Sequence, residues 1–306
     1  MKLALFSDVH GRLRIMLRMV QCWQIAHETH LDAVLLAGDI GCFPDESRFD
    51  KATRRWIERD PEEAGFPRYF MRPKTDVQTV FIQPHIIGPF AEVRCPILFV
   101  AGNHEDFEYL EACRAAVRSA EVPVHTFPVD CYRRILCIEN GHVVTVKAGD
   151  GHRIRIAGLW GVENSRPRSP ARISLEAAER LIAASEDSFD VLLTHDVPHH
   201  SYTGHAGSET ISTVLRACQP PLHVFGHAHP VDGRHEFFAD PVQTRSWIFD
   251  DCGFGKDCNG SLLGAMGILT WDTDEVGGFR GNIELIQDEW LKRMRHRTWQ
   301  HVWPKP

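Results

Sequence analysis

Short apolar runs recur along the chain, and polar residues follow each of them directly. Five such runs occupy residues 3–6, 33–37, 97–101, 191–193 and 222–225. Short apolar runs bounded by Gly, Pro or polar residues are typical of buried strands. The pattern therefore predicts five buried strands, each with polar side chains just beyond its carboxyl end.

Other segments place apolar residues three and four positions apart, the spacing of one helix face. The first such stripe consists of Leu13, Met16, Leu17, Val20 and Trp23. A second helix is expected to start near Asp106, and Ser174 and Ser208 are expected to cap two more. Helices are thus predicted after several of the strands.

A third kind of segment alternates apolar and polar residues, as half-buried strands do. These segments lie at residues 133–138, 142–146, 153–157, 247–249, 266–271 and 282–286. Together with the buried strands they supply enough strands for two sheets. The chain is therefore predicted to be an α/β protein with two mixed β-sheets and helices on the outside.

The polar residues after the five apolar runs form five motifs of one kind, rich in Asp, Asn and His. The motifs are Asp8-Val9-His10, Gly38-Asp39-Ile40-Gly41, Gly102-Asn103-His104-Glu105, Thr194-His195-Asp196 and Gly226-His227-Ala228-His229. Open α/β sheets hold their ligands at the carboxyl ends of strands, so we expect these side chains to meet. Mixed oxygen and nitrogen donors favour Mn, Fe or Zn over a structural zinc site.

The motifs predict a shell for two divalent ions. Asp8 and His10 alternate along a segment expected to be extended, so both can serve one ion. Asp39 is the expected bridging carboxylate. Asn103, His195 and His227 would complete the second ion, and His229 would return to the first.

Such a shell suits the hydrolysis of phosphate esters. Two ions can share a hydroxide that attacks phosphorus, and with Asp8 and Asp39 a charge of about +1 remains to attract an anion. His104 is left without an ion and is the expected general acid for the leaving group. Glu105 is expected either to support the ligands or to be a favourable acid at a helix start, and the second interpretation is favoured.

Because the motifs span residues 8 to 229 and must converge, a single domain over residues 1–306 is expected. Residues 42–96 are longer than a simple crossover needs and hold nine Lys or Arg and nine Asp or Glu. This segment is predicted to be a cap insertion over the site, with a solvated face of ion pairs as the alternative. Residues 288–306 are predicted to form a C-terminal tail that packs back or makes a dimer contact.

Composition narrows the class of protein further. The 306 residues carry a formal net charge of -7, which does not indicate a nucleic-acid or membrane-surface protein. The nine cysteines include no C-x-x-C pair, which favours a reducing compartment. No apolar stretch approaches the roughly 18 residues of a membrane span, and the apolar start is too short for a secretory signal. We therefore expect a cytoplasmic protein with no membrane partner.

In its motifs and their order, the chain resembles the calcineurin-like metallophosphoesterase superfamily across residues 8–229. The resemblance implies a four-layer α/β/β/α sandwich, phosphate ester hydrolysis and the ligand and acid roles given above. Gly41 is followed by Cys42 and Gly102 is preceded by Ala101, so the arginines of protein serine/threonine phosphatases and diadenosine tetraphosphatases are missing. Residues 59–70, 102–105 and 158–162 are loosely similar to RNA lariat-debranching phosphodiesterases, which usually place Cys where this chain has Asp8.

The substrate is expected to be a phosphate ester. A phosphodiesterase acting on nucleic acid (RNA or DNA) or nucleotides is favoured, and a small-molecule phosphomonoesterase or cyclic-nucleotide phosphodiesterase is the alternative. A non-catalytic metal-binding scaffold is less favoured, because binding alone does not need His104. Arg166, Arg168 and His199 are candidate substrate contacts, with exposed polar loops as the alternative. The sequence leaves the oligomeric state open.

Overall fold

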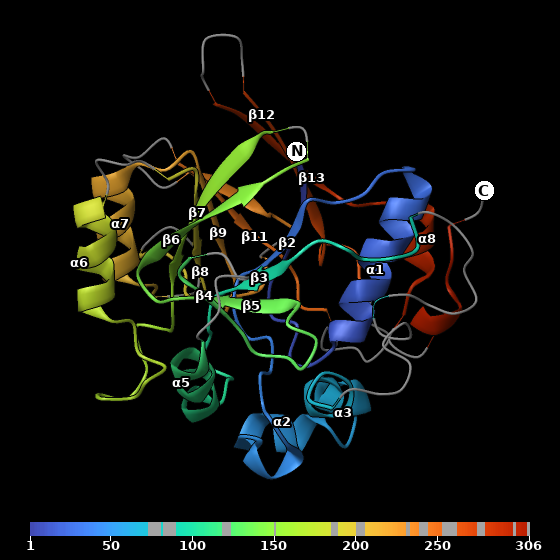
Figure 1. Ribbon diagram of the computed structural model, residues 1–306, viewed down its shortest axis with the longest axis horizontal. Coiled ribbons are helices and arrows are strands. Elements are labelled where there is room, and N and C mark those ends of the chain that lie inside the picture. The colour runs from blue at the N-terminus through green and yellow to red at the C-terminus, as the bar shows by residue number, and fades with distance from the viewer. Residues whose placement is uncertain are drawn as a thin grey trace.

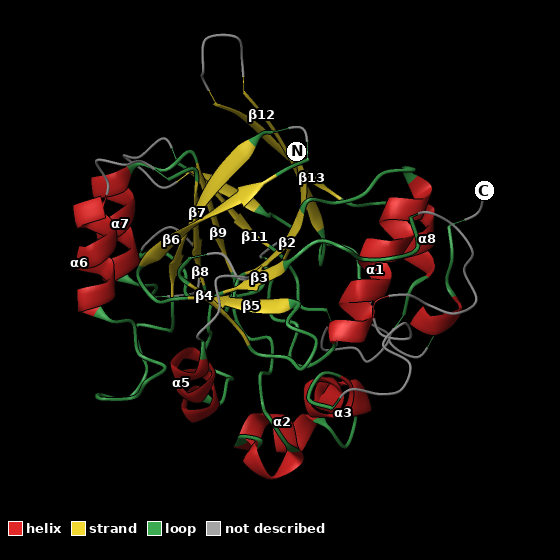
Figure 2. Cartoon of the chain, in the orientation of Figure 1, coloured by secondary structure: helices red, strands yellow, loops and turns green. Residues whose placement is uncertain are grey.

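Two β-sheets pack face to face between outer helices in the computed structural model (Figure 1). The structure describes residues 1–72, 81, 90–117, 124–149, 151–184, 189–199, 206–230, 233–238, 244–252, 262–273, 279–295 and 298–304. Figure 2 shows the strands gathered at the centre and the helices around them. The predicted fold class, a sandwich of two mixed sheets flanked by helices, is confirmed.

The first sheet has seven strands in the order β13-β12-β1-β2-β3-β5-β4. Its parallel centre consists of β1 (Lys2–Phe6), β2 (Ala33–Leu36), β3 (Ile97–Phe99) and β5 (Ile135–Ile138). Its antiparallel edges consist of β4 (Thr126–Pro128), β12 (Gly267–Thr273) and β13 (Phe279–Leu285). Strand β1, the first in the chain, thus lies between β2 and the late strand β12.

The second sheet has six strands in the order β10-β11-β9-β8-β7-β6. Its parallel strands are β7 (Arg153–Leu159), β8 (Val191–Thr194), β9 (Leu222–Phe225) and β11 (Arg245–Ile248). The antiparallel edges are β6 (His142–Lys147) and β10 (Glu236–Phe238). All the strands predicted from apolar runs and alternation are present, and the three-residue strands β4 and β10 were not predicted.

Alternation along the strands separates the apolar layers. Leu3 and Leu5 of β1 point into the layer between the sheets, where they join Val191 and Val224 of the second sheet. Residues on the opposite face of β1, such as Phe6, pack beneath the outer helix. The outer face of the second sheet is covered in the same way by two helices. The apolar residues of the strands therefore fill both the layer between the sheets and the layers beneath the helices.

The helices start where the sequence places their caps. The longer helices are α1 (Leu13–Ala26), α5 (Phe107–Ala116), α6 (Leu175–Ala183) and α7 (Glu209–Cys218). The side chains of Asp106, Ser174 and Ser208 each accept a hydrogen bond from a backbone N–H in the first turn of their helix. Among the described residues, no helix combines the length and apolar character needed to cross a bilayer.

Residues 42–96 contribute short helices in their described part: η1 (Glu46–Arg48), α2 (Lys51–Trp56), η2 (Pro61–Ala64) and α3 (Gly65–Tyr69). Buried Arg12, just after the first motif, pairs with Asp60 at 2.5 Å and with Glu63 at 2.8 Å. A Cβ on Gly65 would lie 2.3 Å from the carbonyl oxygen of Gly11. The insertion therefore packs directly against the loop that carries Asp8 and His10. Residues 73–80 and 82–89 of the predicted insertion lie outside the described residues.

The C-terminal residues return to the first helix. They form α8 (Glu289–Arg293) and η4 (Trp299–His301), in which Trp290 and Trp299 are buried. The guanidinium of Arg18 in α1 donates to the carbonyls of Gln300 and Val302, at 3.1 Å each. The described part of the tail thus packs back on the chain that contains it.

Candidate metal centre

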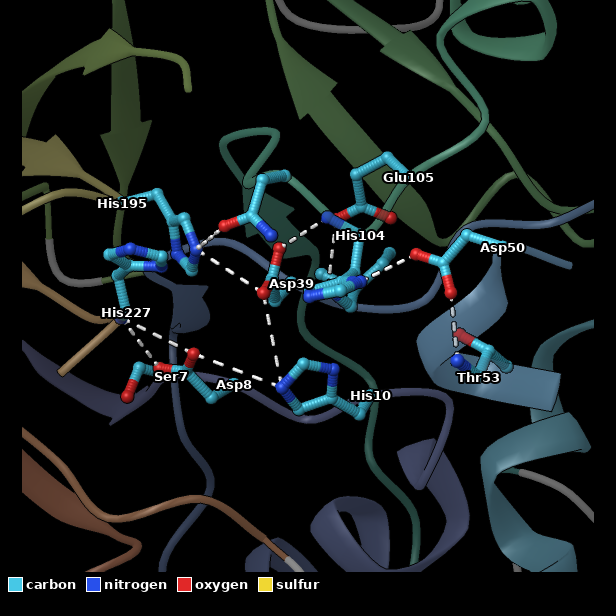
Figure 3. Close-up of polar contacts among 12 residues, drawn as sticks. Ser7, Asp8, His10, Asp39, Asp50, Thr53, His104, Glu105, His195 and His227 are labelled. Atoms are coloured by element: carbon cyan, nitrogen blue, oxygen red, sulfur yellow. Dashed lines mark hydrogen bonds and ion pairs between the residues drawn. The ribbon is translucent and has the colours of Figure 1, made fainter. Parts of the chain in front are cut away.

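The loops after β1, β2, β3, β8 and β9 meet at one rim of the sandwich. These strands run parallel to their neighbours within each sheet, so their carboxyl ends open on the same edge. Figure 3 shows the labelled side chains from these loops pointing toward one another. The structure thus brings together Asp8, His10, Asp39, Asn103, His195 and His227, as the motif order predicts.

The backbone of this rim is unusual at the positions predicted to hold the metal ions. Asp8, His10, Asp39 and His227 all have positive φ, between 45° and 64°. The expectation that Asp8 and His10 lie on an extended segment is therefore wrong. Left-handed backbone at non-glycine residues costs of order 1–3 kcal/mol and persists only where surrounding contacts fix it.

Hydrogen bonds between the first two loops supply that support. The N–H of His10 donates to the carbonyl of Asp39 at 2.7 Å, and the N–H of Asp8 donates to the carbonyl of Gly38 at 3.2 Å. Gly38 itself has no room for a side chain, because a Cβ there would lie 2.3 Å from Nδ1 of His195. Backbone hydrogen bonds thus join the first two loops, and the second loop packs closely against His195 of the fourth motif.

Asp39 occupies the middle of the cluster. Its Oδ2 lies 3.3 Å from Nε2 of His195 and 3.9 Å from Nε2 of His10. Its Oδ1 accepts the backbone N–H of His104 at 2.8 Å. A Cβ on Gly102 would come within 2.1 Å of that oxygen. The carboxylate therefore faces both halves of the predicted shell, where a bridging ligand has to lie.

Asp8 lies on one side of Asp39 and is also buried. Its Oδ1 is 3.9 Å from Nε2 of His10, and its two oxygens lie 3.2 and 3.1 Å from the backbone N–H of His227. Gly226 leaves room for this approach, since a Cβ there would be 2.5 Å from Oδ2 of Asp8. Asp8 and His10 thus share one side of the centre.

His195 and Asn103 lie on the other side. The carbonyl of Ala37 lies 2.9 Å from Nδ1 of His195 and can only accept, so Nδ1 carries the hydrogen and Nε2 faces the centre. Nε2 is 3.2 Å from Oδ1 of Asn103. The ring of His227 stands 5.1 Å from the ring of His195, centroid to centroid. This side therefore presents nitrogen and amide oxygen donors.

The donor set fits divalent metal ions. Donor atoms of Asp8, Asp39 and His195 all lie within 4.8 Å of one another. Burial raises the pKa of Asp8 to about 6, the charge of His195 opposes the rise, and the charge of Asp39 adds to it. Burial alone would lower the pKa of His195, but Asp39 and Asp8 outweigh it and raise that pKa to about 10. A cation among these buried carboxylates is favoured electrostatically.

His104 lies beside this centre and is held by the insertion. Its ring centroid is 5.4 Å from that of His10, and its Nδ1 is 2.5 Å from Oδ2 of Asp50. Burial alone would lower the pKa of His104, but the hydrogen bond to Asp50 and the charges of Asp39 and Asp50 raise it to about 9. These neighbours favour the protonated imidazole of His104 beside the centre.

Glu105 does not act as the acid of a helix start, so that favoured interpretation is wrong. The next helix begins later, with Asp106 as its cap. The buried carboxylate of Glu105 instead accepts the backbone N–H groups of Ile40 at 2.9 Å and Cys42 at 2.6 Å. Glu105 therefore supports the turn that carries Asp39.

The remaining predicted residues lie on neighbouring loops. His229 is exposed. Burial raises the pKa of Asp250, and the charges of His235 and His229 oppose this rise. Arg166 and Arg168 are exposed on the loop after β7. His199 pairs with Glu209 at 3.0 Å, at the start of α7. The assignment of His229 to a metal and of the other three to substrate stays a prediction.

Two acidic residues at the rim were missed. Asp50 contacts His104, which is 54 positions away in the sequence. The sequence pattern could indicate only that Asp50 caps α2. Asp251 follows β11, and its charge adds to the raised pKa of Asp8. Asp251 could have been found, because Phe249-Asp250-Asp251 repeats the pattern of an apolar strand followed by an acid.

A two-sheet sandwich with Asp, Asn and His gathered at the carboxyl ends of its strands defines a class of metal-binding hydrolase folds. Comparison with known families makes this specific: the model of the calcineurin-like phosphoesterase family matches residues 1–231, and the chain belongs to that family. Curated protein sequences include no match.

Solved structures of similar fold come from several organisms. The protein TT1561 of Thermus thermophilus is 14% identical, with a TM-score of 0.46 over 92% of this chain and 97% of that one. A novel phosphatase of Mycoplasma pneumoniae is 13% identical, with a TM-score of 0.42 over 98% of each chain.

Proposed function

We propose that this chain is a two-metal phosphoester hydrolase that prefers phosphodiesters of nucleotides or nucleic acid. The observation that carries the proposal is the buried cluster of Asp8, Asp39 and His195 with His104 at its mouth. Family membership supports metal-dependent phosphoester hydrolysis. The donor chemistry favours Mn, Fe or Zn.

The ligand residues divide between two ion positions. Asp8, His10 and His229 would hold one ion, Asn103, His195 and His227 the other, and Asp39 both. Bound divalent ions supply Lewis acidity, a nucleophile from water near neutral pH and positive charge for phosphoryl oxygens. The left-handed backbone and the N–H groups on Asp8 and Asp39 fix these side chains before substrate arrives. The shell is therefore preorganised.

His104 would deliver a proton to the leaving oxygen. Its Nδ1–H points to Asp50, so its Nε2 is the nitrogen left to face substrate. Asp50 stabilises the charged imidazole and fixes its tautomer, and the raised pKa keeps the proton available. Asp50 is a positioning residue in this scheme, since it acts through His104.

The pairing of Arg12, the described arginine that follows the first motif, favours diesters over monoesters. A phosphomonoester dianion is commonly gripped by arginine, yet this chain has Cys42 and Ala101 beside its metal loops. Arg12, which follows His10, is buried and neutralised by Asp60 and Glu63. A diester carries one negative charge fewer and needs less compensation.

Relative rates on two substrates test the proposal. Metal-reconstituted protein is assayed with bis(4-nitrophenyl) phosphate and with 4-nitrophenyl phosphate, and then with cyclic nucleotides, linear nucleic acids and branched RNA. We expect kcat/KM to be higher for the diester, and chelation to abolish both activities. A higher kcat/KM for the monoester would assign a phosphomonoesterase, and no hydrolysis of any of these would reject an enzyme.

A further inference from the structure

A second group of metal-binding side chains lies outside the centre, where the two sheets meet at their edges. His125 directly precedes β4, Glu139 directly follows β5, and His142 begins β6. Strand β4 is an edge of the first sheet, and β6 is an edge of the second. The group therefore connects the two layers of the sandwich.

The backbone brings these three residues together rigidly. The N–H of Glu139 donates to the carbonyl of His125 at 2.9 Å, and the N–H of His142 donates to the carbonyl of Glu139 at 3.1 Å. The second bond closes a tight turn through Gly141, whose φ is +74°. A Cβ on Gly141 would lie 2.6 Å from the carbonyl oxygen of Ala177 in α6. The turn is thus fixed from both sides.

The side chains converge within the range of one ion. Oε2 of Glu139 lies 3.2 Å from Nδ1 of His125 and 4.0 Å from Nδ1 of His142. One donor atom from each of the three lies within 4.8 Å of the other two. Zn–N and Zn–O bonds of about 2.0–2.2 Å in a tetrahedron put ligand atoms about 3.3 Å apart. Nδ1 of His142 also lies 3.1 Å from the carbonyl of Asn140, and the two imidazole rings stack with their centroids 4.4 Å apart, so the imidazoles have to rotate to close on zinc.

Two arginines near the turn pair with other acids, and the charge of Glu139 also acts on Arg114. Arg114 pairs with Glu111 at 2.6 Å, and Arg180 pairs with Glu176 at 3.1 Å. These two arginines thus have acidic partners of their own. The side chains of Glu139 and His142 are each 26% exposed and that of His125 is 43% exposed, so an ion from solvent can enter.

We propose that His125, Glu139 and His142 form a third divalent-metal site, separate from the catalytic centre, that takes Zn²⁺ with water as the fourth ligand. Two neutral imidazoles and one carboxylate are a donor set that zinc accepts with a water in the open position. An ion here ties β4 and β5 of the first sheet to β6 of the second. The site is structural, and hydrolysis does not pass through it.

Metal counting tests the proposal on the full chain. Wild type, Glu139→Gln and His142→Ala are stripped with chelator, dialysed against Zn²⁺ and analysed by inductively coupled plasma mass spectrometry. We expect each variant to bind one zinc fewer per chain than wild type. His152→Ala is the matched control, because His152 is a partly exposed histidine that lies near Asp272, outside the group. Equal zinc content in all four proteins would overturn the proposal.

Thermal unfolding gives a second readout that does not depend on the catalytic centre. In an Asp39→Asn background, zinc at a hundredfold excess over Kd should raise Tm by about 5 °C. Adding His142→Ala should remove that rise, and an unchanged rise would refute the site. Hydrolysis by Glu139→Gln should equal that of wild type. Failure of the proposed catalytic function would leave zinc content and Tm shifts intact, so the two proposals fail separately.

Discussion

Replacing Asp50 by Asn tests whether the insertion positions the general acid. The change removes the negative charge opposite Nδ1 of His104 and keeps the size of the side chain. Asp50 also caps α2, because its Oδ1 accepts the N–H of Thr53 at 2.7 Å. Asn caps helices as well as Asp does, so stability should change little. The substitution thus separates catalysis from folding.

The magnitude follows from the hydrogen bond that is lost. At 2.5 Å the contact of Asp50 with His104 is a short, charge-assisted hydrogen bond. Hydrogen bonds to charged groups contribute about 1.5–3 kcal/mol, which corresponds to a loss in kcat of about 10- to 150-fold. KM should stay nearly constant, because Asp50 acts through His104 and makes no substrate contact.

The assay is steady-state hydrolysis of an aryl phosphodiester, with metal content measured in parallel. Asp45→Asn is the control: Asp45 caps η1 in the same insertion by accepting the N–H of Ser47 at 2.8 Å, and it is exposed. His104→Ala alone should lower kcat by about 10²–10⁴-fold without loss of metal. In that background Asp50→Asn should have almost no further effect.

Two results would refute the reasoning. Unchanged kcat in Asp50→Asn would show that the hydrogen bond does not support proton transfer. An equal loss of kcat with and without the His104 side chain would show that Asp50 acts by another route.

Three further predictions concern metal, stability and substrate. Asp39→Asn should lower the affinity for both ions together, and loss of only one ion in metal analysis would contradict a bridging role. Burial lowers the pKa of His223 to about 3. Below about pH 6.5 His223 is protonated in the unfolded chain but not in the folded one, so the unfolding free energy should fall by about 1.4 kcal/mol per pH unit toward pH 3. In urea titrations at several pH values, the unfolding free energy of His223→Gln should depend on pH less steeply by that amount. An equal pH dependence in the variant and wild type would exclude the effect. Replacing Arg166 and Arg168 by Ala should raise KM about tenfold with little change in kcat, whereas unchanged KM would place both outside the substrate path.

The sequence predicts most of the fold because its strands and helices carry local signals. Apolar runs mark β1, β2 and β8, and serine caps mark α6 and α7. Strands β4 and β10 were missed because three residues are too few for alternation to show. Local pattern thus fails where an element is held mainly by its neighbours.

The candidate site divides in the same way. Its donor residues were predictable, because each follows an apolar strand and parallel strands share a rim. The left-handed backbone at Asp8 and Asp39 was not, because contacts between loops stabilise it, and Asp adopts this conformation at only a minority of positions. The contact of Asp50 with His104 joins residues 54 positions apart, and no local pattern encodes it.

The position of β1 in its sheet has a consequence for biosynthesis. This strand is synthesised before one of its two neighbours, β12, which spans Gly267–Thr273 and pairs with it from Lys2 to Leu5. The nascent polypeptide must therefore carry an open strand edge until β12 has been synthesised. Such edges promote aggregation, so chaperone occupancy during synthesis, rather than final stability, is expected to limit the yield of this protein.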